Sequence, residues 1–132
     1  MITGLYAALL ALIQIKLTFG VVKLRRGKKV SIGDGGDDEL ARRIRVHGNF
    51  IETVPITLIL MMIAELNGSP FWCLHVLGVA IVGARISHAI GISSGTGHGK
   101  FRFYGMLMTI NVIIAAALLC LWFAWPLLLP VS

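Results

Sequence analysis

Residues 45–64 read RVHGNFIETVPITLILMMIA, and this stretch decides the fold because it joins a polar segment directly to an apolar one. Residues 56–64 carry no charge and suit a helix that crosses hydrocarbon. Arg45, Asn49 and Glu52 nevertheless stand at the start of the same segment. Lipid penalises such groups unless protein or water satisfies them. The stretch therefore predicts a polar site recessed into one side of a helical membrane protein.

The composition of the 132-residue chain is also that of a membrane protein. Hydrophobic residues make up 57%, charged residues 14%, and the mean hydropathy is +0.86. A soluble domain of this length has too high a surface-to-volume ratio to hide so much apolar surface. We expect a single domain over residues 1–132. The two cysteines, Cys73 and Cys120, are too few for a disulfide framework or a cysteine metal site, and we expect no metal.

Four segments are long and apolar enough to span a bilayer, which predicts an all-α bundle of four transmembrane helices. They run over about residues 2–24, 40–66, 71–90 and 103–129. The first lacks the basic n-region and cleavage site of a signal peptide, so we interpret it as a retained helix. Before the second, glycines make a turn after which Asp37 or Asp38 can cap the helix. Trp122 and Trp125 suit an interfacial aromatic belt.

The distribution of basic residues predicts the orientation of the chain. Of the net charge of +6, most comes from one loop and its flanks, since eight of the twelve Lys and Arg residues lie between residues 23 and 45. The loop at residues 93–100 is also basic, whereas residues 67–70, NGSP, contain neither Lys nor Arg. Basic residues mark cytoplasmic loops, so we expect the first and third loops inside and both termini outside. The basic residues do not form a face with interleaved aromatic residues, so we do not expect nucleic-acid binding.

The polar residues of the second span form a stripe. Arg45, Asn49 and Glu52 are spaced i, i+4, i+7 and fall on one helical face, while His47 lies well round the helix. Glu52 sits about 10 Å deeper than Arg45 at 1.5 Å per residue. A carboxylate at that depth should face protein or water.

The other spans offer polar residues at a similar depth. We expect one polar layer in the cytoplasmic half, made of Lys16, Asn49, Glu52, Arg85, His88 and Asn111. One interpretation is an ion pair of Glu52 with Lys16 or Arg85 that holds the bundle together. The other is an anion site, because one carboxylate cannot neutralise all the cations around it. Several carboxylates or a thiolate would suit such a site.

These residues resemble the motifs of the MAPEG family, the membrane-associated proteins in eicosanoid and glutathione metabolism. The motif RxxxNxxExxP is present at Arg45, Asn49, Glu52 and Pro55, after a basic loop. Ala84-Arg85 and then His88 end the third span, and Arg102 opens the fourth. The resemblance covers nearly the whole chain, and the sequence of the first loop and the motif is most similar to a short bacterial branch of the family.

The resemblance implies a homotrimer of four-helix subunits in the bacterial inner membrane, with glutathione as cosubstrate between neighbouring subunits near the cytoplasmic face. It also implies a set of site residues. Those for glutathione binding are Arg45, His47, Asn49, Glu52, Arg85, His88 and Arg26, the last sharing the end of the first helix with Arg25. Arg102 would be catalytic, because a nearby cation lowers the pKa of a thiol and would stabilise the thiolate.

The chain departs from the family pattern at three aromatic positions. Thr53 follows the motif Glu where the glutathione-using enzymes often carry Tyr, His88 replaces a common Tyr, and Ile92 stands in place of another. The expected activity is conjugation of glutathione or a similar thiol to a lipophilic electrophile, or reduction of a hydroperoxide. The alternative is a non-catalytic binder of an anionic metabolite or lipid headgroup on the same scaffold. A small multidrug transporter and a structural subunit are further alternatives; the first span of such a transporter would carry a carboxylate, whereas this one carries Lys16.

Overall fold

The computed structural model describes residues 1–93 and 99–125, with the side chains of residues 92 and 93 excepted. Over these residues the chain forms helices α1 (Ile2–Lys28), α2 (Asp38–Leu66), α3 (Phe71–Ser93) and α4 (Gly99–Ala124) and no strand. The prediction of an all-α four-helix bundle is confirmed. All four helices are long and apolar enough to cross a membrane. Residues 126–129 of the predicted fourth span lie outside the described residues.

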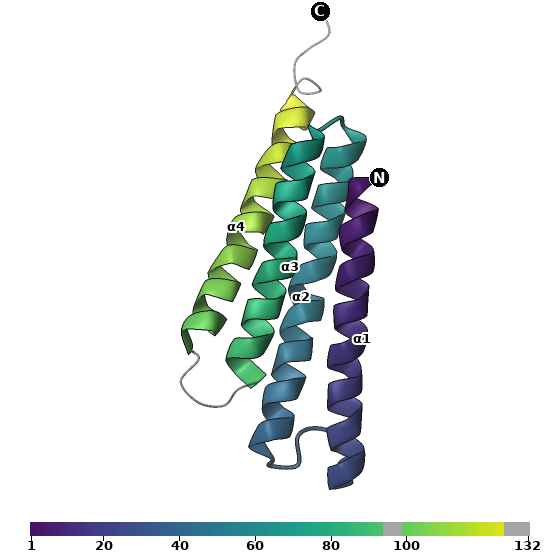
Figure 1. Cartoon of the computed structure of the whole chain (residues 1–132), viewed down its shortest axis with the longest axis vertical. Helices are drawn as coiled ribbons and strands as arrows, with labels where there is room; N and C mark the ends of the chain where they lie inside the picture. Colours follow the sequence, from purple (N-terminus) through teal and green to yellow (C-terminus); the bar gives the residue numbers. More distant parts are fainter. Residues whose placement is uncertain (94–98, 126–132) are drawn as a thin grey trace, which may run out of the picture.

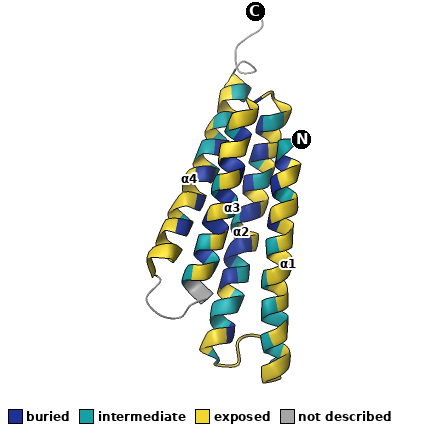
Figure 2. Ribbon diagram, in the orientation of Figure 1, coloured by how far each residue is buried: buried dark blue, intermediate teal, exposed yellow. Residues whose placement is uncertain are grey.

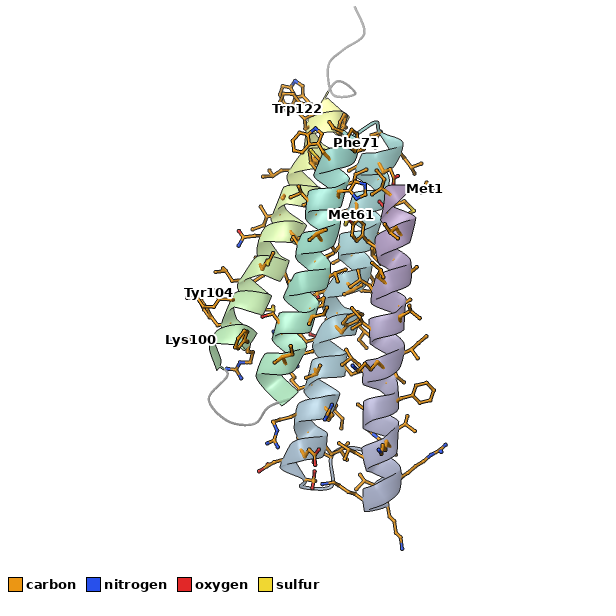
Figure 3. The ribbon with its side chains drawn as sticks, in the orientation of Figure 1. Met1, Met61, Phe71, Lys100, Tyr104 and Trp122 are labelled. Carbon is orange, nitrogen blue, oxygen red and sulfur yellow. The ribbon has the colours of Figure 1, made fainter. Side chains whose placement is uncertain are left out.

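The helices run up and down in alternation (Figure 1). Helices α2 and α3 form the centre of the bundle; α1 packs against both on one side, and α4 packs against both on the other. In the described residues α1 and α4 do not touch. We call the end with Ile2, residues 67–70 and Trp122 the amino end, and the end with Lys28, Asp38 and Lys100 the basic end. Trp122 and Phe71 lie with Met1 at the amino end, and Lys100 lies at the opposite end of α4 (Figure 3).

The connection between α1 and α2 explains why both helices are longer than their predicted spans. Helix α1 continues to Lys28 because basic residues extend its last turn beyond the apolar segment, and it ends where Lys29 takes a left-handed conformation with φ 54°. Asp37 caps α2 by accepting from the Leu40 backbone N–H at 2.8 Å, so one of the two predicted caps is confirmed. The Lys28 ammonium bonds the same carboxylate and ties the two helix ends together.

The buried residues belong mainly to α2 and α3, as the dark ribbon segments of Figure 2 show. The core is built from Tyr6, Leu10, Phe50, Val54, Met61, Leu77, Ile81, Val112 and Ala116. Only Thr3, Tyr6 and Leu10 of α1 are buried, and all three lie in its first three turns. The rest of α1 carries many exposed apolar side chains, which is the surface that lipid or a neighbouring subunit covers.

Glycines allow the closest approaches between helices. A Cβ on Gly78 would come 2.2 Å from the Tyr6 ring, so α1 and α3 meet there only because the side chain is absent. A Cβ on Gly91 would come 2.3 Å from the Arg102 backbone nitrogen, and one on Gly105 would come 2.7 Å from the His88 nitrogen. The last two contacts bring α3 and α4 together at the basic end.

Pro55 lies inside α2, where it removes one backbone N–H from the helical ladder. Threonine hydroxyls on either side donate back to the helix, from Thr53 to the Asn49 carbonyl at 2.9 Å and from Thr57 to the Thr53 carbonyl at 2.8 Å. These bonds go to carbonyls other than that of Ile51, which loses its ladder donor at the proline. The polar stripe lies in the part of α2 before the proline.

Candidate functional site

The stripe on α2 forms as its spacing predicts. Arg45 and Glu52 are exposed, and Arg45 Nη1 lies 3.9 Å from Glu52 Oε1. Asn49 lies between them and is buried, with 7% of its surface exposed. An exposed pair at this distance contributes little to stability. Glu52 thus pairs with Arg45 on its own helix, and the predicted pairing with Lys16 or Arg85 does not occur among the described residues.

A hollow of about 370 Å³ opens beside this stripe at the basic end, and we call it the recess. It is lined by Arg45, Asn49, His88, Arg102, Phe103 and Met106. The recess brings together four of the predicted site residues, from three helices. Phe103 and Met106 were not predicted; Met106 stands four residues after Arg102, the spacing that places two side chains on one helical face.

Three contacts with α3 fix the position of Arg102 at the start of α4. Ser87 Oγ donates to the Phe101 carbonyl at 3.1 Å, and His88 Nδ1 bonds the Arg102 carbonyl at 3.1 Å. The close approach at Gly91 adds a backbone contact. Because α3 holds the backbone at Phe101 and Arg102, the exposed guanidinium of Arg102 extends from a fixed position at the rim of the recess.

Two buried polar atoms in the recess have no hydrogen-bond partner among the described residues: His88 Nε2 and Asn49 Oδ1. A carbonyl only accepts, so His88 Nδ1 must carry the proton in its bond to Arg102, and Nε2 of the neutral ring is then an acceptor. Asn49 Nδ2 already points at the Met106 sulfur at 3.9 Å. The residues that line the recess therefore combine two exposed guanidinium groups with two buried acceptors that have no partner among the described residues.

Arg85 does not line the recess but lies beneath it in the interior, with 1% of its surface exposed. Its Nη1 donates to Thr53 Oγ1 at 3.0 Å and to Thr109 Oγ1 at 3.5 Å, and its guanidinium lies 5.9 Å from the centre of the Phe50 ring. No carboxylate pairs with it in the described parts of the chain. Thr53, which stands where the glutathione-using enzymes often carry Tyr, thus provides a hydroxyl that accepts from Arg85.

Three other predicted site residues do not line the recess: Glu52, His47 and Arg26. His47 faces α1, where its Nε2 lies 3.0 Å from Thr18 Oγ1. Arg26 is exposed at the end of α1. Its neighbour Arg25 donates to the Ser31 carbonyl at 2.6 Å and lines a second hollow of about 370 Å³, which it shares with Arg45 and Glu52.

The single polar layer expected from depth alone is not assembled. Lys16 is exposed and lines a groove between α1 and α3, on the opposite side of the bundle from the recess. Asn111 points outward from α4 and donates to the Leu107 carbonyl at 2.9 Å. In the described residues no three His, Cys, Asp or Glu side chains come together as a metal site.

Comparison with known proteins agrees with the motifs. The model of the MAPEG family matches residues 3–122. The chain is 38% identical over 125 residues to the inner membrane protein YecN of Escherichia coli K12, and equally to that of Escherichia coli O6:H1. Each match covers 93% of this chain and 92% of the relative. The fold, the four spans, the motif residues and these matches agree: the chain is a multi-pass membrane protein and belongs to the MAPEG family.

Proposed function

We propose that the recess binds glutathione or a closely similar thiol, and that the protein conjugates it to lipophilic electrophiles or uses it to reduce hydroperoxides. The observation that carries the proposal is the pairing of donors and acceptors in one hollow. Arg45 and Arg102 present cationic donors, while Asn49 Oδ1 and His88 Nε2 are buried acceptors without partners. Glutathione is zwitterionic, with two carboxylates, an ammonium, amide N–H groups and a thiol, so it matches both kinds of group.

The recess suits a thiolate in particular. A guanidinium beside a thiol favours the ionised sulfur, which is the nucleophile. Arg102 is the better candidate because the contacts with α3 hold its backbone at the start of α4. Arg45, which has only a weak pairing with Glu52, is available for a carboxylate. The buried charge of Arg85 adds to the positive field below.

The proposed reaction is the attack of the thiolate sulfur on an electrophilic carbon, which forms a carbon–sulfur bond and expels the leaving group. With a hydroperoxide, the thiolate instead breaks the O–O bond, releases the alcohol and leaves a sulfenate. The sulfenate takes up a proton from water and reacts with a second thiol to give disulfide and water. The apolar side chains Phe103 and Met106 at the mouth of the recess give a lipophilic substrate access from the bilayer. No metal is needed for either step.

The assembly we propose is a homotrimer in the bacterial inner membrane, with the basic end in the cytoplasm. Glu52 and Asn111 are exposed on a single chain at a depth where lipid would penalise them, which favours their being covered by a neighbour. His47 and Arg26 lie too far round the bundle to line the recess of their own chain. They would reach a bound thiol only from a neighbouring subunit, which fits glutathione bound between subunits.

The experiment that tests the proposal is isothermal titration of glutathione into detergent-purified protein, beside Arg45→Ala and Arg102→Ala. We expect saturable binding by the wild type and a loss of at least tenfold in affinity for each variant, because each loses a charge-assisted bond. The thiolate absorbance should fall in Arg102→Ala even at saturating glutathione. Lys29→Ala, an exposed cation at the same end, is the matched control. No binding at millimolar glutathione would reject the proposal.

A second candidate is a non-catalytic binder of an anionic metabolite. Thr53 favours it, because this position has no phenol and its hydroxyl is engaged by Arg85. Retained ligand binding without any thiolate-dependent turnover over a panel of electrophiles and hydroperoxides would select this candidate. Turnover that disappears in Arg102→Ala would exclude it.

A further inference from the structure

A second groove with cationic side chains lies on the opposite side of the bundle from the recess. It has a volume of about 380 Å³ and runs between α1 and α3, and we call it the α1–α3 groove. Its apolar walls are Ile13, Leu17, Ile86, Ala89 and Ile90. Lys16 and Arg43 line the same groove from α1 and α2. The groove therefore has apolar walls and two positively charged side chains, one from α1 and one from α2.

Neither cation is neutralised within the described parts of the chain. No carboxylate lies within ion-pair distance of Lys16 or Arg43, and neither side chain makes a hydrogen bond there. Arg43 extends across α1 at Gly20, where an added Cβ would lie 3.9 Å from its Nη1. This is an ordinary van der Waals distance, so the Arg43 guanidinium lies against α1 at Gly20. Two unpaired cations thus face a groove inside a membrane-spanning bundle.

The position of the cations in the membrane calls for an anion that arrives with apolar chains. Lys16 lies twelve residues from the end of α1 at Lys28, about 18 Å along the axis. Long basic side chains extend along apolar surface towards the headgroup level. Basic pockets between transmembrane helices recognise anionic lipid headgroups, whereas a free soluble anion gains nothing from the isoleucine and leucine walls.

We propose that the α1–α3 groove binds one anionic diacyl phospholipid from the leaflet at the basic end. Its phosphate lies between Lys16 and Arg43, and one acyl chain runs along the apolar walls. Such a lipid would also fill the space between α1 and α3, where α1 contributes no buried side chain beyond Leu10. The proposal does not depend on the proposed function, because the recess lies on the other side of α2 and α3.

The test measures lipid binding to the purified full chain by native mass spectrometry, with phosphatidylglycerol and phosphatidylcholine as probes. We expect the wild type to prefer phosphatidylglycerol at least tenfold. Lys16→Gln/Arg43→Gln should lose about thirtyfold in affinity for phosphatidylglycerol and little for phosphatidylcholine, since each cation near the surface contributes to anionic-lipid attraction. The matched control is Lys23→Gln/Lys29→Gln, which removes two exposed cations outside the groove and should change the affinity less than threefold.

Three results would overturn the proposal. An equal loss of phosphatidylglycerol affinity in the control variant would show that the whole basic end attracts anionic lipid without a specific site. Equal binding of a single-chain fatty acid would show that the groove does not select a diacyl lipid. A change of oligomer mass in Lys16→Gln/Arg43→Gln without a change in lipid affinity would assign the groove to a subunit contact. Circular dichroism checks that the variant folds, and Lys16→Arg/Arg43→Lys, which keeps both charges, should retain the preference.

Discussion

The two ends of the bundle use their charged groups in different ways. At the amino end, the Glu65 carboxylate accepts from the backbone N–H groups of Ile2 at 2.5 Å and Thr3 at 2.9 Å. Tyr6 Oη lies 2.9 Å from His75 Nδ1, and the same ring packs on Gly78. At the basic end, by contrast, the guanidinium groups of Arg45 and Arg102 stay exposed. Buried polar atoms without a partner among the described residues occur at both ends: the hydroxyls of Thr3 and Ser69 at the amino end, and acceptors of Asn49 and His88 at the basic end.

This contrast separates a part of the molecule where charged groups hold helices together from the part where we propose that a ligand binds. A buried polar atom without a partner lowers stability, so a protein retains one where another need prevails. At the amino end, bonds between helices use the polar groups of Glu65, Tyr6 and His75. At the basic end, Asn49 and His88 keep acceptors unused at the cost of stability. Substitutions at the two ends should therefore have different consequences.

The largest effect is expected for Gly78→Ala at the amino end. The new Cβ would come within 2.2 Å of the Tyr6 ring, which its contact with His75 holds in place, so α1 and α3 must separate. We expect a loss of about 2–3 kcal/mol in unfolding free energy, measured by denaturation in detergent. The matched control is Gly83→Ala on the same helix, where nothing lies within 4 Å, and it should leave stability unchanged or slightly raised. Equal effects of the two would contradict the contrast.

Glu65→Gln should destabilise the protein by about 1–2 kcal/mol. The amide bonds the first backbone N–H groups of α1 more weakly and no longer places a negative charge at the helix N-terminus. Hydrogen exchange should quicken in the first turns of α1. Glu52→Gln, the corresponding change at the basic end, should cost under about 0.5 kcal/mol because its partner is an exposed arginine 3.9 Å away. If Glu52→Gln cost as much as Glu65→Gln, Glu52 would be structural.

Asn49→Leu should stabilise the protein while impairing ligand binding. The substitution removes a buried acceptor that has no partner and replaces it with an apolar side chain of similar size. We expect a gain of about 1 kcal/mol in unfolding free energy and a loss of at least fivefold in glutathione affinity. Paired melting and titration experiments measure both quantities. A loss of stability would show that Asn49 holds the bundle together, and it would remove the separation between the two ends.

The smallest effect concerns Asp37 in the α1–α2 connection. The bond from the Lys28 ammonium, together with the Leu40 N–H, holds the pKa of this carboxyl below its ordinary value of 3.8. A depressed folded-state pKa stabilises above the ordinary value, and the stabilisation disappears as the pH falls through the folded-state pKa. In Asp37→Asn the first amides of α2 should therefore exchange faster than in the wild type at pH 7, and the difference should shrink as the pH falls below 3.8. A difference that persists in acid would mean that the charge is not its cause.

Much of the fold follows from the sequence, because apolar length predicts the four spans and an aspartate after a glycine turn predicts the start of α2. The stripe of Arg45, Asn49 and Glu52 follows from helical geometry alone. Depth along a helix is equally predictable. The rotation of a helix about its axis is not, because α3 and α4 are apolar on nearly all sides and no pattern selects the face that turns inward.

Because the sequence does not predict how each helix is rotated about its axis, several residues lie where they were not expected. Lys16 and Asn111 lie at the expected depth but face away from the recess. Arg85 faces inward to the hydroxyls of Thr53 and Thr109, residues that give no sign of this role in the sequence. Glycine contacts at Gly91 and Gly105 set the rotation of α3 against α4, and these depend on atoms from both helices at once.

The bond of Glu65 to the start of α1 also bears on how the protein is made. Helix α1 leaves the ribosome before this partner, which follows 62 residues later near the end of α2. Until then its first amides depend on water at the membrane surface. The two helices thus reach their final state only as an inserted hairpin, and α1 gains a fixed position in the bilayer when α2 has crossed it.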